Sequence, residues 1–394
     1  MRQLFLLLLL VSGVASAQSL HDAVEKAWER QPAAQAQMLR RDELAARLNA
    51  ASAWLPSPPS VALRQRTDRL NSNNGSREYE AELAIPLWLP GQSEKESAVV
   101  SAEQDLQRDS LAAAKWKLAG EVRESYWQTQ AANIDLLTAL RRRKDSIELV
   151  ADVERRLKAG DLARTDFNQA KGAEQAARVA VSEAELRLIR AQATFVALTG
   201  LDTLPAEGEN LVTHPPPSNE HPLLRQLERA ANTADARMRL ASSIKRDNPE
   251  LTLGLRRERG SNPEPYANSL TVGIRIPFAT DGRNQPRIAA ANADFIESST
   301  ALARERERLA SEVRIAQGEL DQTRSALDLA EERQRLAIEN DQLIAKAFSL
   351  GEIDLASRLR AATERYAAVG DFARSRLESA RAISRLNQAF GVLP

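Results

Sequence analysis

The residue types that most often carry chemistry are scarce or scattered in this sequence. Its three histidines are His21, His214 and His221, and no two of them have the spacing that places two metal ligands on one face of a helix. Cysteine is absent, which excludes disulfides, thiol catalysis and lipid attachment at a cysteine. We therefore expect no zinc or copper site built from histidine and cysteine.

The carboxylates are numerous but are mixed with basic residues. The chain has 54 acidic and 54 basic residues, so its net charge is zero. Such mixing along helices predicts ion-paired, solvated faces rather than acid–base catalysis. The sequence has no G-x-S-x-G motif and no phosphate-binding glycine loop, so we expect neither an enzyme nor a cofactor. A nucleic-acid-binding protein usually has a basic excess, which this chain lacks. The basic run at 141–144 stands beside Glu148 and Asp152, so we expect a solvated helix face there and no nucleic-acid partner.

The first 17 residues predict a secretory signal peptide. Arg2 precedes an apolar run at 4–11, and Ala15-Ser16-Ala17 is an A-x-A cleavage site. The apolar run is shorter than the roughly 20 residues of a spanning helix. No later run reaches about 18 apolar residues, so any membrane crossing must be made by strands.

One pattern of landmarks occurs twice. Ile85-Pro86-Leu87 recurs as Ile276-Pro277-Phe278, and three glycines recur at the same offset of 191 residues. Those pairs are Gly91 with Gly282, Gly160 with Gly351, and Gly200 with Gly391. We predict two repeats, 18–200 and 221–394, joined by a linker at 201–220. Three consecutive prolines at 215–217 support the linker, because they cannot continue a helix.

Each repeat is expected to contain three helices and two strands. The first helix is predicted at 19–53 and 221–246, a very long one at 92–158 and 285–349, and a return helix at 161–199 and 352–389. The long segments are rich in Ala, Glu, Arg, Leu and Gln, and Pro286 falls in a first turn, where proline is tolerated. A helix of about 65 residues would be roughly 100 Å long, which is typical of a coiled coil or a helical tube.

The predicted strands, at about 59–68, 77–88, 249–258 and 268–279, alternate apolar and polar residues, so each has two unlike faces. This pattern fits a sheet packed on a soluble core, or a barrel with lipid outside and water inside. Four strands cannot close a barrel, whose practical minimum is about eight, whereas three chains would supply twelve. We expect an outer, apolar face with Tyr79, Leu83, Ile85, Leu270, Val272 and Ile274. We expect a channel-lining face with Arg64, Glu78, Glu80, Glu82, Arg256 and Arg275. Trp54, Trp88, Tyr79 and Tyr266 are candidates for an aromatic girdle at the membrane interface.

The turns after the long helices are candidate partner-binding tips. Gly160 and Gly351 can adopt the left-handed conformation that stops a helix. Leu162 and Ile353 follow as apolar residues at exposed turns, with no obvious core to enter. Polar residues that could bind a partner or merely cap the return helices surround them: Asp161, Thr165, Asp166, Glu352 and Asp354.

This ordered set resembles the TolC family of outer-membrane efflux proteins over essentially the whole mature chain. Pro86, Gly91, Pro277 and Gly282 resemble its strand-to-helix junctions, and residues 158–166 and 349–354 resemble its periplasmic tips. Residues 55–58 and 248–252 resemble the CzcC-like branch, which works with heavy-metal pumps of the resistance-nodulation-division type. Many relatives carry acidic residues just beyond the second tip, but residues 355–360 here contain none, so an acidic gate would fall to Glu352 or Asp354.

The resemblance implies a mainly α fold with a β-barrel portion. A homotrimer would form a twelve-stranded barrel in the outer-membrane lipid, continuous with a helical tunnel in the periplasm. The tips would meet a periplasmic adaptor and an inner-membrane pump, and the chain would be a passive exit duct. Heavy-metal cations are one expected cargo, with drug export or type I protein secretion as alternatives. A periplasmic coiled-coil scaffold is the alternative of a different class.

Overall fold

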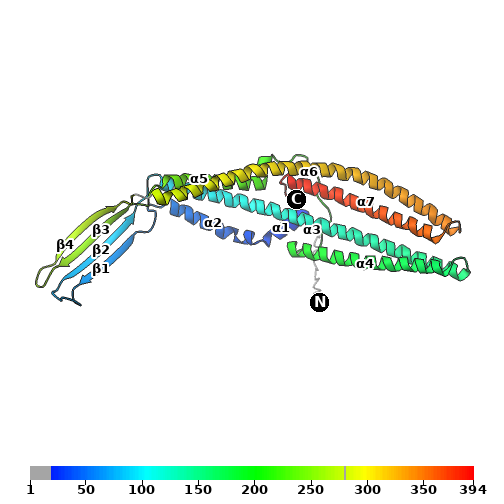
Figure 1. Ribbon diagram of the computed structural model, residues 1–394, viewed down its shortest axis with the longest axis horizontal. Helices are drawn as coiled ribbons and strands as arrows, with labels where there is room; N and C mark the ends of the chain where they lie inside the picture. Colours follow the sequence, from blue (N-terminus) through cyan, green and yellow to red (C-terminus); the bar gives the residue numbers. More distant parts are fainter. Residues whose placement is uncertain (1–18, 279–280) are drawn as a thin grey trace, which may run out of the picture. The chain divides into compact units, whose positions relative to one another are not determined.

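The computed structural model describes residues 19–278 and 281–394 (Figure 1). The predicted signal peptide lies outside the described residues. Internal contacts divide the described chain into two compact units. One unit contains residues 19–31, 114–217 and 309–394, and the other contains 32–113 and 218–308.

The described residues are mainly helical with one four-stranded antiparallel sheet, which confirms the predicted fold class. The helices are α1 (Leu20–Glu29), α2 (Pro32–Ala51), α3 (Gln92–Ala159), α4 (Arg164–Thr199), α5 (Pro222–Ser243), α6 (Asp281–Ser349) and α7 (Leu355–Ala389), with a short 3₁₀ turn η1 (Ser218–Glu220). The strands are β1 (Ser60–Thr67), β2 (Arg77–Pro86), β3 (Glu250–Arg259) and β4 (Ala267–Arg275). Within the described ranges, no helix combines the length and apolar character needed to cross a membrane.

The prediction of one helix over 19–53 is wrong, because the segment forms two helices. Ser19 begins α1 with a capping box, in which its hydroxyl accepts from the Asp22 N–H and the Asp22 carboxylate accepts from the Ser19 N–H. The helix ends at Glu29, and α2 begins at Pro32. A proline disfavours helical geometry at the preceding residue and cannot donate a backbone hydrogen bond, so Pro32 starts a new helix.

The core of the first unit depends on small residues. In α1, Ala23 and Ala27 are completely buried, and they join a cluster with Val122 and Tyr126 of α3 and Phe195 of α4. A second cluster packs Ala316 and Leu320 of α6 against α7 through these residues: Ala382, Leu386 and Ala389. Alanine lets two helix backbones approach closely, which explains why alanine-rich segments pack here rather than remain separate.

The second long helix starts earlier than predicted. It begins at Asp281, so Pro286 lies inside α6 rather than in its first turn. Proline lacks an N–H, so one hydrogen bond to the preceding turn is missing at this point. The first long helix matches its prediction closely, because Gln92 begins α3 directly after Gly91. At 68 and 69 residues, α3 and α6 are each about 100 Å long by helical rise.

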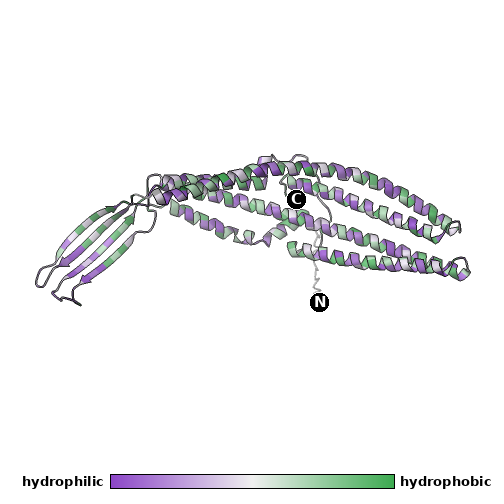
Figure 2. Cartoon of the chain, viewed as in Figure 1, coloured by the Kyte–Doolittle hydropathy of each residue, from purple (hydrophilic) through white to green (hydrophobic). Residues whose placement is uncertain are grey.

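The four strands pair in sequence order, β1-β2-β3-β4, in one antiparallel sheet. Val61 of β1 lies opposite Leu83 of β2, which lies opposite Leu253 of β3, which lies opposite Val272 of β4. This register aligns the alternating patterns of all four strands. Figure 2 shows the alternation as bands of hydrophobic and hydrophilic residues along the strands.

Candidate channel and docking surfaces

The register places all six predicted channel-lining residues on one face of the sheet. Arg64 lies opposite Glu80, which lies opposite Arg256. Ion pairs tie this polar face together across the strands. Arg64 lies 3.5 Å from Glu80 and 3.3 Å from Glu82, Arg256 lies 2.8 Å from Glu78, and Arg275 lies 3.0 Å from Glu250. The face is therefore charged and suited to contact with water.

The opposite face is apolar and exposed. Leu63 is 78% exposed, Leu270 is 69% exposed and Ile274 is 60% exposed. Tyr79, Leu83, Ile85 and Val272 lie on this same face by register. An apolar surface of this extent usually marks an interaction site, because monomeric soluble proteins rarely expose one. The sheet of a single chain is therefore not packed on a soluble core, and the lipid-facing alternative agrees with its exposure.

The four predicted girdle aromatics have different surroundings. Tyr79 is 40% exposed on the apolar face, and Tyr266 stands just before β4. Trp54 lies outside the strands and is 98% exposed. Trp88 follows β2 and donates its indole N–H to the Ala53 carbonyl, 2.9 Å away. A girdle role for these side chains stays a prediction.

The two strand-to-helix junctions are not identical. After Pro86, the Leu87 N–H donates to the Pro249 carbonyl at 2.8 Å, and Gly91 has a φ of 72° immediately before α3. The second junction has Pro277 shortly after β4, but Gly282 lies within α6. Gly91 and Gly282 therefore occupy equivalent positions in the sequence but differ in conformation.

Both tip glycines stop their helices in the same way. Gly160 has a φ of 90° and Gly351 a φ of 78°, both in the left-handed region. The next residue in each turn donates its N–H back across the last helical turn, from Asp161 to Arg156 and from Glu352 to Ala347. This is the Schellman arrangement, so the sequence correctly indicated how each long helix ends.

The expectation that Leu162 and Ile353 have no core to enter is wrong. Both are partly buried against a small apolar cluster that contains Val153, Phe348 and Leu355. Arg156 of α3 strengthens this cluster, because its guanidinium donates to the Phe348 carbonyl at 2.9 Å and stacks on the Phe348 ring. The turns of two neighbouring helical hairpins form this small core together. Neither hairpin contains it alone, so the sequence of one hairpin does not indicate it.

The polar residues of the tips divide into capping and exposed groups. The return helices start at Arg164 and Leu355, three residues later than predicted, because residues 163 and 354 are extended N-caps. Asp166 accepts the Ala163 N–H at 2.9 Å, and Asp354 accepts the Ser357 N–H at 2.8 Å. Hydrogen bonding from the Ser357 hydroxyl, followed by that from its backbone N–H, lowers the pKa of Asp354. The remaining polar tip residues are exposed: Asp161, Thr165 and Glu352.

An ionic network that joins α3, α6 and α7 near the tips was not predicted from the sequence. Arg365 of α7 lies 2.6 Å from Asp145 of α3 and 2.9 Å from Asp341 of α6, and Arg358 also pairs with Asp341. Tyr366 donates its hydroxyl to Asp145 at 3.1 Å. Burial, together with Asp145, raises the pKa of Tyr366 to about 12, so the hydroxyl stays a donor at neutral pH. No local spacing pattern indicates these pairs, because Asp145 and Arg365 are distant in sequence.

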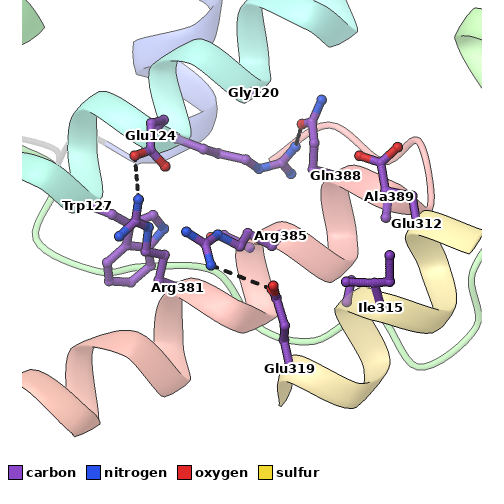
Figure 3. A pocket seen from close by; sticks show the side chains of 13 residues that line it. Gly120, Glu124, Trp127, Glu312, Ile315, Glu319, Arg381, Arg385, Gln388 and Ala389 are labelled. Atoms are coloured by element: carbon purple, nitrogen blue, oxygen red, sulfur yellow. Dashed lines mark hydrogen bonds and ion pairs between the residues drawn. The ribbon is translucent and has the colours of Figure 1, made fainter. Parts of the chain in front are cut away.

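A pocket of about 440 Å³ lies among α3, α6 and α7 (Figure 3). Its charged side chains neutralise one another, since Arg381 pairs with Glu124 and Arg385 lies 3.5 Å from Glu319. Arg123, which also lines the pocket, donates a hydrogen bond to the Gln388 side chain. In the portions of the chain that are described, no group of three or more His, Cys, Asp or Glu side chains could hold a metal ion.

Comparison with known proteins agrees with this geometry. Residues 23–201 match the family model described as outer membrane efflux protein. No curated protein matches the sequence significantly. The family match covers α1 through α4, including β1, β2 and the first tip.

Solved structures match almost the whole chain. The fold is similar to a crystal structure of CusC, with a TM-score of 0.79, 18% identity, and coverage of 95% of this chain and 92% of that one. The outer membrane channel CmeC of Campylobacter jejuni gives a TM-score of 0.76 at 14% identity, with 94% and 85% covered. The outer membrane protein VceC of Vibrio cholerae gives 0.75 at 14% identity, with 95% and 96% covered. The chain therefore shares the TolC-like fold of these proteins, and its residues 23–201 match the outer membrane efflux family model.

Proposed function

We propose that the chain is the outer-membrane exit duct of a tripartite efflux system, acting as a passive conduit rather than an enzyme. The observation that carries the proposal is the two-faced sheet: an exposed apolar face and an ion-paired polar face on the same four strands. The match of residues 23–201 to the outer membrane efflux family and the likeness to outer membrane channels support it.

Transport through such a duct requires assembly. Four strands leave β1 and β4 as open edges, and unpaired edges are not stable within a lipid bilayer. Three chains would close twelve strands with the apolar face toward lipid and the polar face toward the lumen. An inner-membrane pump and a periplasmic adaptor would supply energy and most of the substrate choice, with docking at the tips around Gly160 and Gly351.

The test is assembly and transport together. The full chain, purified in detergent, is expected to have the mass of a trimer and to give ion-conducting channels in a planar bilayer. A soluble, elongated monomer without conductance would instead favour the periplasmic scaffold. Deletion of the gene should sensitise cells to the cargo of the cognate pump.

Heavy-metal cations are the proposed cargo. The sequences at 55–58 and 248–252, similar to the CzcC-like branch, support this choice over drugs or proteins. The polar sheet face is compatible with cations, because its strand residues comprise five glutamates and four arginines. Growth of the deletion strain in graded zinc, copper, cobalt and cadmium, with antibiotics as the comparison, tests the cargo independently of assembly.

A further inference from the structure

Charge is distributed unequally between the two faces of the sheet. The five glutamates of the four strands all lie on the polar face: Glu78, Glu80, Glu82, Glu250 and Glu258. The apolar face carries charge at three strand positions, and each is an arginine: Arg77, Arg257 and Arg259. In the described part of the chain, none of these three forms an ion pair with a carboxylate.

The three arginines gather at one end of the apolar face. Arg77 of β2 lies directly opposite Arg259 of β3, beside the hairpin turns and away from the helices. Arg257 lies two residues nearer the helices, opposite Tyr79. The next residue on this face is Leu255, where the apolar surface begins. A basic cluster thus borders an exposed apolar surface on the same side of the sheet.

Two of the three arginine side chains are held in place. The Tyr266 ring packs against both Arg257 and Arg259, with guanidinium carbons 4.6 Å and 4.9 Å from the ring centroid. Arg259 also donates its Nε–H to the Gly75 carbonyl at 2.9 Å. The loop carboxylates have local partners, because Asp68 accepts from Asn74 at 2.6 Å and Glu264 accepts from Ser261 at 3.2 Å.

Like charges placed directly opposite each other destabilise an antiparallel pair, so Arg77 and Arg259 need an anion nearby to offset their repulsion. A guanidinium group offers a planar set of donors that matches a phosphate with two parallel hydrogen bonds. Basic side chains also gain about 1 kcal/mol each near an anionic lipid surface. A phosphate group would therefore satisfy a cluster that the chain itself leaves without a carboxylate.

We propose that Arg77, Arg257 and Arg259 bind the phosphate groups of lipids in the membrane that surrounds the sheet. This inference rests on the proposed function, because it requires the apolar face to lie in lipid. An amphiphile explains both halves of the surface: its acyl chains would cover Leu63, Leu255 and Leu270, and its phosphates would meet the arginines at the end near the turns. Free phosphate would use the arginines alone and would leave the apolar surface uncovered.

The experiment compares the full chain with the triple variant Arg77→Gln, Arg257→Gln and Arg259→Gln. Each arginine is expected to contribute about fivefold to the affinity for diphosphoryl lipid A. The triple variant, purified in detergent, should therefore bind this lipid roughly 100-fold more weakly. Lipid A stripped of both phosphates should bind the two proteins equally. Arg66→Gln is the matched control, because Arg66 is an exposed arginine near the same turns but on the polar face, and it should bind like the wild type.

Further measurements distinguish a failure of the proposed function from a failure of the lipid-phosphate site. Flotation with neutral phosphatidylcholine vesicles reports membrane insertion, so a wild-type protein that does not float contradicts the proposed function itself. A protein that inserts but binds phosphorylated and dephosphorylated lipid A equally overturns the lipid-phosphate site alone.

Inorganic phosphate that displaces no lipid A at millimolar concentration supports the inference, whereas complete displacement assigns the cluster to free phosphate and overturns it. If the triple variant does not assemble, the exposed Arg257→Gln variant alone should weaken binding about fivefold, and unchanged binding would overturn the inference.

Discussion

Arg123 of α3 donates to both carboxylate oxygens of Glu209, at 2.6 Å from Nε and 2.8 Å from the terminal nitrogen. Both side chains are less than a tenth exposed. Asn387 of α7 donates to the same carboxylate at 3.1 Å and to the Asn210 carbonyl at 2.9 Å. The segment predicted as a linker, 201–220, is therefore bound to α3 and α7 through a buried carboxylate.

Removing Glu209 is expected to destabilise the protein strongly. Glu209→Ala leaves Arg123 buried without its carboxylate, which typically costs about 3–5 kcal/mol. Glu154→Ala breaks an exposed pair with Lys158 and should cost less than about 1 kcal/mol. Thermal unfolding of both variants in detergent measures the difference. Equal midpoints would show that the Arg123 pair does not hold the linker.

The two sheet faces are expected to differ in their tolerance of charge. Ile274→Arg places a charge on the apolar face and should cost about 2–4 kcal/mol if that position lies near the bilayer midplane. Thr271→Arg is the matched control in the same strand, because Thr271 lies on the polar face by register. Trimer yield from membranes measures both. Equal yields would contradict a lipid-exposed apolar face.

Variants at the tips can distinguish a role in docking from a role in folding, because the structure shows which tip residues are packed and which are exposed. Leu162→Ser with Ile353→Ser should weaken the tip core, because both residues pack against Phe348 and its neighbours. Asp161→Ser with Glu352→Ser changes exposed carboxylates and should leave trimer yield unchanged while reducing export. Resistance in cells carrying the cognate pump, measured beside trimer yield, checks both. Full resistance of the Asp161 and Glu352 variant would exclude these carboxylates from docking.

The ionic network behind the tips is expected to hold α7 to both of its neighbours. Arg365→Ala removes the guanidinium that hydrogen-bonds Asp145 and forms an ion pair with Asp341, and the change should cost about 1–3 kcal/mol. Amide hydrogen exchange should accelerate in α7 around residue 365. Arg360→Ala, a change at an exposed position on the same helix, should not alter exchange there. Identical exchange in the two variants would contradict this role.

His221 predicts a pH dependence of stability. Burial lowers its pKa from 6.5 to about 4, with Glu305 and Arg308 as the charged neighbours that modify it. Between pH 6.5 and 4 the unfolded chain binds a proton at His221 that the folded chain does not, so stability falls as pH falls through this window. The unfolding midpoint of His221→Asn should therefore fall less steeply than that of the wild type from pH 7 to 4. Parallel curves would exclude His221 as a source of the dependence.

The sequence alone determined the fold class and the C-terminal ends of the two long helices. Alternation in the strands and the long runs of helix-forming residues are local patterns, and so are the glycines that stop α3 and α6. The assignment of strand residues to two faces followed too, because successive residues of a strand point to opposite faces. Pro32 also carried a local signal for the break between α1 and α2, although composition favoured one long helix.

Only the tertiary structure decided which distant side chains meet. The pairs Arg123–Glu209 and Arg365–Asp145 join residues far apart in sequence, and the partly buried state of Leu162 depends on a second hairpin beside its own. The arginine cluster of the apolar face likewise required the pairing of β2 with β3, since Arg77 and Arg259 are opposite each other only in that register. Periodicity fixes the face on which a side chain lies, whereas its partner depends on how separate elements pack.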